Sequence, residues 1–227
     1  GLAALTLAAG LAIMALVQDP PAADQPGGKG SMLDVFRIPA VWLILPFLFV
    51  NYAPAAALRG LWVGPYVGTL YGPDLIGQAS LFMAIAMVIG AIGYGPLDRI
   101  FGTRKGVILA GNLGAAACLL LLAWMPASGY WSSVLLLSAV GVLGLSFPLV
   151  MAHGRSFFPP HLLGRGVTLL NMFSIGGVGV MQVASRQVYA ATPAADPAAP
   201  FAALFLFFGV ALLAGCALYA FSRDRID

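Results

Sequence analysis

Long apolar runs, separated by short polar or proline-containing turns, make up most of this sequence. An α-helix needs roughly 20 apolar residues to cross the hydrocarbon core of a bilayer. The pattern predicts seven membrane-spanning helices, at about 1–17, 38–67, 75–94, 107–124, 130–152, 166–190 and 201–221. The first run is short and begins without methionine, so we expect a helix truncated within the membrane. The predicted fold class is all-α, a polytopic bundle of seven transmembrane spans.

Composition agrees with a membrane protein and narrows the functions that the chain could have. The sequence is 61% hydrophobic and 8% charged, whereas soluble domains carry roughly 25% charged residues. The net charge of +3 does not indicate nucleic-acid binding, because the basic residues are scattered among loops. Cys118 and Cys216 stand alone in apolar runs, so we predict no metal site, disulfide or cofactor. Common catalytic motifs are absent, and we expect the protein not to be an enzyme.

The distribution of basic residues predicts the orientation of the spans. Nine of the eleven fall in alternate loops or in the C-terminal tail, at Lys29, Arg37, Arg99, Arg104, Lys105, Arg155, Arg165, Arg223 and Arg225. The opposite turns, around Asp74, Pro126 and Asp196, contain none. Because basic residues in short loops remain on the cytoplasmic side, we expect the first set of loops and the C-terminus to be cytoplasmic.

Polar and aromatic residues share one face of the span at 38–67. On a helical wheel at 100° per residue, Asn51, Arg59, Trp62 and Tyr66 lie within about 80° of one another. Tyr52 lies slightly beyond them. Such a face should contact protein or water. Two interpretations of the arginine remain open: a side chain that snorkels to the interface, or a cavity-facing cation that binds an anionic or carbonyl-bearing solute.

Pro46 and Pro54 should kink the span at 38–67, because proline interrupts helical hydrogen bonding. No acid lies in the middle of any span, so the spans show no carboxylate that could carry protons. The two histidines, His153 and His161, are expected to be solvated in the loop at 153–165.

The span at 166–190 carries a second polar face. Its members on a helical wheel are Asn171, Ser174 and Gln182, with Thr168, Ser185 and Arg186 beside them. Gly176, Gly177 and Gly179 interrupt the span near mid-depth. One interpretation is a broken or bent helix that lines a cavity. The other is contact between helices, in which Asn and Ser hydrogen-bond a neighbour and Gly allows close approach.

A charged segment between the third and fourth spans carries a recognisable order of residues. It contains Gly95, Leu97, Asp98, Arg99, Gly102, Arg104 and Lys105. This order resembles the signature loop of the major facilitator superfamily, roughly G-x-L-x-D-R-x-G-R-R/K. It departs in spacing, with one residue missing before Asp98 and one extra between Arg99 and Gly102. The stretches at 61–66 and 164–171 also resemble bacterial members of this superfamily, at the outer end of span seven and the start of span eleven.

The resemblance implies that the chain holds spans six to twelve of a twelve-span transporter. The expected divisions are a truncated span six at 1–17, a central cytoplasmic linker at 18–35, a C-terminal six-helix half at 36–221 and a cytoplasmic tail at 222–227. It further implies secondary transport of a small solute by alternating access, across a bacterial inner membrane. The expected partners are the lipid bilayer, the missing N-terminal half and a small-molecule substrate.

The same resemblance implies roles for individual residues. Asn51, Tyr52, Asn171 and Ser174 would contact the solute, and Asp98 and Arg99 would help to hold one closed state on the cytoplasmic face. Arg59 and Arg186 suggest an anionic solute, provided that they are not interfacial. The alternative function is a seven-helix ligand-sensing receptor, which has the same orientation. A retinal-type receptor is excluded, because both lysines lie outside the spans.

Overall fold

The computed structural model describes residues 2–16, 31–193 and 196–226. In these ranges every regular element is a helix, which confirms the predicted all-α class. The α-helices are α1 (Leu2–Leu16), α2 (Met32–Val35), α3 (Val41–Asn51), α4 (Ala53–Ala57), α5 (Val63–Leu70), α6 (Ile76–Phe101), α7 (Arg104–Trp124), α8 (Tyr130–Leu143), α9 (Phe147–Arg155), α10 (Leu163–Ala191) and α11 (Ala199–Tyr219). Between them lie a π-helix, η1 (Leu58–Trp62), and two 3₁₀-helices, η2 (Pro73–Leu75) and η3 (Pro160–Leu162).

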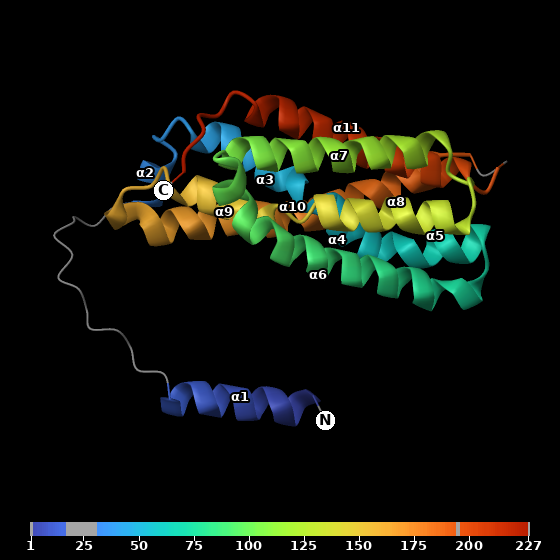
Figure 1. Ribbon diagram of the computed structural model, residues 1–227, viewed down its shortest axis with the longest axis horizontal. Coiled ribbons are helices and arrows are strands. Elements are labelled where there is room, and N and C mark those ends of the chain that lie inside the picture. The colour runs from blue at the N-terminus through green and yellow to red at the C-terminus, as the bar shows by residue number, and fades with distance from the viewer. Residues whose placement is uncertain (1, 17–30, 194–195, 227) are drawn as a thin grey trace.

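Six helical segments within the described ranges are long and apolar enough to cross a membrane. They are Val41–Leu70, Pro73–Phe101, Arg104–Trp124, Tyr130–Arg155, Pro160–Ala191 and Ala199–Tyr219, and they run alongside one another as a bundle (Figure 1). The first predicted span, at 1–17, corresponds to α1, whose 15 residues reach only about 22 Å. This helix is separate from the bundle in Figure 1. Of the predicted linker, residues 18–30 lie outside the described ranges, and α2 forms most of the rest.

The first helix of the bundle is interrupted and lies at its centre. It consists of α3, α4, the π-helix η1 and α5. The break between α3 and α4 comes two residues before Pro54, which has no N–H to donate to the preceding turn. Pro46 lies inside α3 without interrupting it, so only one of the two prolines coincides with a break. This helix packs against α10 and α11 through α3, against α10 through α4 and against α6 through α5.

Aromatic side chains fill the core around this central helix. Tyr66 of α5 packs edge-on against Phe201 and Phe205 of α11, with ring centroids 5.2 and 5.1 Å apart. Toward the other end, Phe47 of α3 stacks on Tyr219 of α11 at 4.4 Å. All five side chains are fully buried. They fix the central helix against α11 over most of its length.

Two polar segments that were expected to be loops are helical. Residues 95–101 belong to α6, which ends at Gly102, where φ is +63°, a conformation that glycine adopts without strain. Thr103 then caps α7, its hydroxyl accepting the Gly106 N–H at 2.9 Å. His153 was expected to be solvated, but it is fully buried in α9. Its two ring nitrogens are bonded to the Tyr219 hydroxyl and the Arg223 carbonyl, which replace water.

The predicted break at the glycines of the span at 166–190 does not occur, because α10 continues from Leu163 to Ala191. Gly177 is instead a point of close approach. A Cβ there would lie 2.1 Å from the Phe49 carbonyl oxygen of α3, while Gly176 has open space around it. The span that does break is the one before it, between α8 and α9, at residues 144–146.

Candidate functional site

A buried hydrogen-bonded group joins the two interrupted helices. Asn51 is the last residue of α3, Ser146 precedes α9, and Asn112 lies in α7 between them. The Asn51 amide nitrogen donates to the Asn112 side-chain oxygen at 2.7 Å and to the Ser146 hydroxyl at 3.0 Å. The Asn112 amide nitrogen donates to the Ile108 carbonyl at 2.8 Å and to Ser146 at 2.8 Å. Asn51, a predicted solute contact, therefore lies inside the bundle and holds the two breaks together.

Sequence reasoning missed Asn112 and Ser146. A signal for each is present. Asn112 is a lone amide in an apolar run, and such a group must find a partner inside the membrane. Ser146 lies between Gly144 and Pro148, two residues that loosen a helix and leave its backbone groups in need of bonds.

Two further predicted contacts lie close to these breaks. Tyr52, between α3 and α4, is half-buried, with its ring 5.8 Å from that of Phe147 at the start of α9. Ser174 of α10 is fully buried, and its hydroxyl has no hydrogen-bond partner among the described residues. The Asn51 amide oxygen is likewise unbonded within the described ranges.

The π-helix η1 separates residues that a regular helical wheel places together. Trp62 is buried and its indole N–H donates to the Ser185 hydroxyl of α10 at 2.9 Å. Arg59, three residues earlier, is exposed. A π-turn contains more residues than an α-turn and so shifts the phase of the side chains that follow. The predicted stripe is therefore split, with Asn51, Trp62 and Tyr66 inside the bundle and Arg59 outside.

An open polar face remains on the surface of α10 and η1. We use this name for Arg59, Asn171, Gln182 and Arg186. Asn171 and Arg186 are exposed and Gln182 is partly exposed. Gln182 lies beside η1, since a Cβ on Gly60 would be 3.9 Å from its amide nitrogen. Within the described part of the chain, none of these four side chains has a hydrogen-bond or ion-pair partner. Polar groups facing lipid are costly, so this face should meet water or more protein.

The signature residues gather where α6 ends and α7 begins. Asp98, in the last turn of α6, and Arg104, the first residue of α7, form an ion pair of 3.0 Å, and both are buried. With Gly95 and Arg99 they line a cleft of about 350 Å³, which Pro148 and Leu149 of α9 help to close. Gly102 lies in the turn, and Leu97 lines a different cleft.

Lys105 connects the signature segment to the C-terminal tail. Its ammonium group donates to the carbonyls of Ala220 and Ser222, at 2.6 and 2.8 Å, just after α11. Its backbone N–H donates to the Asp224 carboxylate at 2.9 Å, and the Thr103 hydroxyl donates to the other oxygen of that carboxylate. Asp224 thus lies at the N-terminus of α7, where a negative charge is favoured.

The environment of Asp224 affects its ionisation. Partial burial raises the pKa of this carboxyl, but the hydrogen bonds from Thr103 and the Lys105 backbone lower it, so the net pKa is below the ordinary value. The folded protein therefore favours the charged carboxylate. Sequence reasoning did not single out Asp224.

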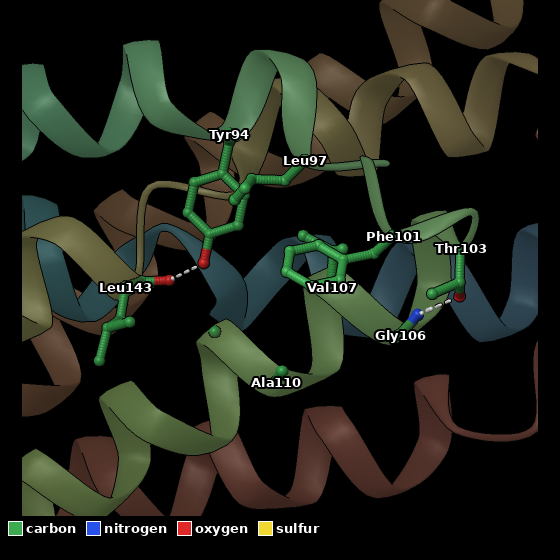
Figure 2. A pocket seen from close by; sticks show the side chains of 9 residues that line it. Tyr94, Leu97, Phe101, Thr103, Gly106, Val107, Ala110 and Leu143 are labelled. Carbon is green, nitrogen blue, oxygen red and sulfur yellow. Dashed lines mark hydrogen bonds between the residues drawn. The ribbon is translucent and has the colours of Figure 1, made fainter. Parts of the chain in front are cut away.

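An apolar cleft of about 440 Å³ lies between α6 and α7 (Figure 2). The Tyr94 hydroxyl donates to the Leu143 carbonyl at the end of α8, at 2.6 Å, so this carbonyl has a partner beside the helix break. Gly111 makes room for this hydroxyl, because a Cβ there would lie 1.7 Å from it. Leu97 and Phe101 line the rest, and no residue of the open polar face contributes. The cleft suits an apolar group.

The apolar bundle of six membrane-length helices defines an integral, multi-pass membrane protein. No protein-family model matches the sequence. The chain is similar to the gentisate transporter of Corynebacterium glutamicum, with 31% identity over 166 residues. The match covers 70% of this chain and 35% of that protein, so the chain spans about a third of the length of this relative.

Proposed function

We propose that this chain is the C-terminal half of a secondary active transporter of the major facilitator type, which moves a small solute by alternating access. The observation that carries the proposal is the open polar face, whose side chains have no partners within the described ranges. In a membrane such a face needs a second body of protein, with water between the two. A missing N-terminal half would supply both, and the similarity to a transporter supports the same conclusion.

The charge of the open polar face favours an anionic solute. Arg59 lies 11 residues, or roughly 16 Å, before the end of its helical segment at Leu70, well inside the candidate span. Arg186 is one helical turn beyond Gln182, next to η1. The relative transports gentisate, as its name states, and gentisate is an aromatic carboxylate. We propose an aromatic carboxylate as the substrate class, with its carboxylate on Arg59 and a hydroxyl or ring edge near Gln182, which lies beside η1. Asn171, roughly 16 Å further along α10, would line the same cavity.

The signature segment would act at the other end of the same half. We propose that the buried Asp98–Arg104 pair keeps α6 and α7 together as one unit while the exposed Arg99 contacts the N-terminal half in one closed state. We place this end on the cytoplasmic side of a bacterial inner membrane, because the basic residues of the bundle concentrate there.

Uptake by the full-length protein tests the proposal. Cells that express it should accumulate labelled gentisate, or benzoate as a second aromatic carboxylate, faster than cells with the empty vector. Arg59→Gln should reduce this uptake by at least about tenfold, since a charge-assisted hydrogen bond contributes roughly 1.5–3 kcal/mol. Arg155→Gln, which removes an exposed arginine outside this face, is the matched control and should leave uptake unchanged.

Two results would count against this function. If no aromatic carboxylate is taken up while a neutral sugar is, the substrate class is wrong. If Arg59→Gln and Arg155→Gln reduce uptake equally, the open polar face is not where the solute binds.

A further inference from the structure

A cleft of about 390 Å³ lies where the first helix of the bundle begins and the last one has ended. Its floor is apolar, formed by Ile38, Leu43, Phe157 and Phe221. Arg223 and Arg225 of the C-terminal tail also line it. We call this the tail cleft. Because both membrane helices end beside it, the cleft lies at the membrane surface, with apolar walls toward the bilayer and two cations beside them.

The tail is held in place, so both arginines stay at the cleft. The Arg225 guanidinium donates to the Ser156 carbonyl at 2.8 Å and lies 5.0 Å from the centroid of the Phe157 ring. The Arg223 carbonyl is bonded to the buried His153 ring at 2.9 Å. One of five guanidinium N–H groups is used on Arg225, which leaves others for an anion. Because the folded protein already orders this side chain, an anion that binds it loses less conformational entropy.

No described acid neutralises these two arginines. Asp224 lies between them in the sequence, but its carboxylate is bonded to Thr103 and to the Lys105 backbone. The tail therefore presents its cations to the cleft and its acid to α7. Asp34, near α3, is paired with Arg37 at 2.9 Å.

We propose that the tail cleft binds an anionic phospholipid, with the phosphate between Arg223 and Arg225 and an acyl chain along the apolar floor. Basic pockets beside membrane helices recognise anionic headgroups in this way. A further mark of the membrane interface is Trp42 of α3, the residue before Leu43. Its side chain is exposed and its indole N–H donates to the Phe36 carbonyl at 2.9 Å. The site is separate from the open polar face and does not depend on the proposed transport activity.

Lipid binding to the purified full-length protein in detergent tests this site. Native mass spectrometry would count bound phosphatidylglycerol and phosphatidylcholine, and the thermal unfolding midpoint would be followed with each lipid and with inorganic phosphate. We expect phosphatidylglycerol to bind and to raise the midpoint more than the other two. Each basic residue near an anionic surface contributes roughly fivefold to binding, so Arg223→Gln with Arg225→Gln should weaken it about 25-fold.

A matched control separates this site from general charge attraction. Arg155→Gln with Arg165→Gln removes two exposed arginines outside the cleft and should leave phosphatidylglycerol binding unchanged. Ala40 also lines the cleft. Ala40→Phe narrows the floor while keeping both charges, and it should weaken phospholipid binding. The proposal is overturned if phosphatidylcholine binds equally well, if inorganic phosphate alone gives the full shift, or if the control pair weakens binding as much as the tail pair.

Discussion

Polar side chains have partners within the protein at the signature end of the bundle, around residues 95–105, but not on the open polar face. At the signature end, Asp98 is paired with Arg104, Lys105 donates to two carbonyls, and Asp224 accepts from Thr103. On the open polar face, Arg59, Asn171 and Arg186 are exposed and have no partner within the described ranges. Inside a membrane a polar group without a partner costs free energy. Residues that satisfy each other hold the fold together, whereas those left over are available for a solute or another part of the protein.

The largest loss of uptake is expected from replacing a residue that makes no contact needed for folding. Asn171→Leu in the full-length protein should abolish solute uptake and leave membrane insertion and the unfolding midpoint unchanged, because its amide bonds nothing in the described bundle. Met172→Leu, an exposed neighbour, is the control and should retain uptake. Normal uptake by Asn171→Leu would remove this residue from the mechanism and weaken the contrast between the two regions.

At the signature end we expect a loss of stability instead. Asp98→Asn should lower the free energy of unfolding by about 3 kcal/mol, because it removes the buried carboxylate charge that pairs with the Arg104 guanidinium. Replacing both, Asp98→Leu with Arg104→Met, should recover most of that loss. Denaturant unfolding in detergent would measure both. A double variant as unstable as Asp98→Asn would show that the residues act separately.

Close packing of α10 on α3 gives a smaller, matched test. Gly177→Ala should cost about 1–3 kcal/mol of unfolding free energy, since the new methyl group would meet the Phe49 backbone. Gly176→Ala, one residue away and facing open space, should change stability by less than about 0.5 kcal/mol. Equal costs at the two positions would contradict the observed crossing of these helices.

The smallest effect is expected at Asp224. The pKa of its carboxyl is lowered in the folded protein. The carboxylate is therefore ionised and holds the tail at any pH above the ordinary pKa of an aspartate, which is about 4. This contribution is lost as the pH falls through the lowered pKa. Fluorescence anisotropy of a probe at residue 226 should drop under those conditions. Asp224→Asn should give low anisotropy at every pH, and an unchanged pH response in that variant would show that another group controls the tail.

Element identity was largely predictable from the sequence, because a membrane helix needs only length and apolarity. The spans at 107–124 and 201–221 correspond to α7 and α11 almost residue for residue. Boundaries were less predictable at polar ends. Charged residues at 98–99 suggested a loop, but Asp98 is paired with Arg104 across the turn, on α7, where no local pattern shows it. The single histidine of α9 was misplaced for the same reason.

The candidate site was predictable only in part. A wheel at 100° per residue grouped Arg59 with Trp62, and the π-helix from Leu58 to Trp62 separated them. The polar face of α10 was recognisable because that helix is regular. Which residues of this face are buried, however, depended on how α3 and η1 pack against it. Asn112 and Ser146 became part of the site only through contacts 34 to 95 residues apart in the chain.

By itself the sequence determined that the chain is helical and where its apolar segments lie, since these follow from the cost of placing polar groups in hydrocarbon. Tertiary structure decided which polar side chains bond to other parts of the protein and which stay exposed without a partner. That outcome depends on how helices cross and where they break, because a hydrogen bond between distant residues requires both to arrive at one place.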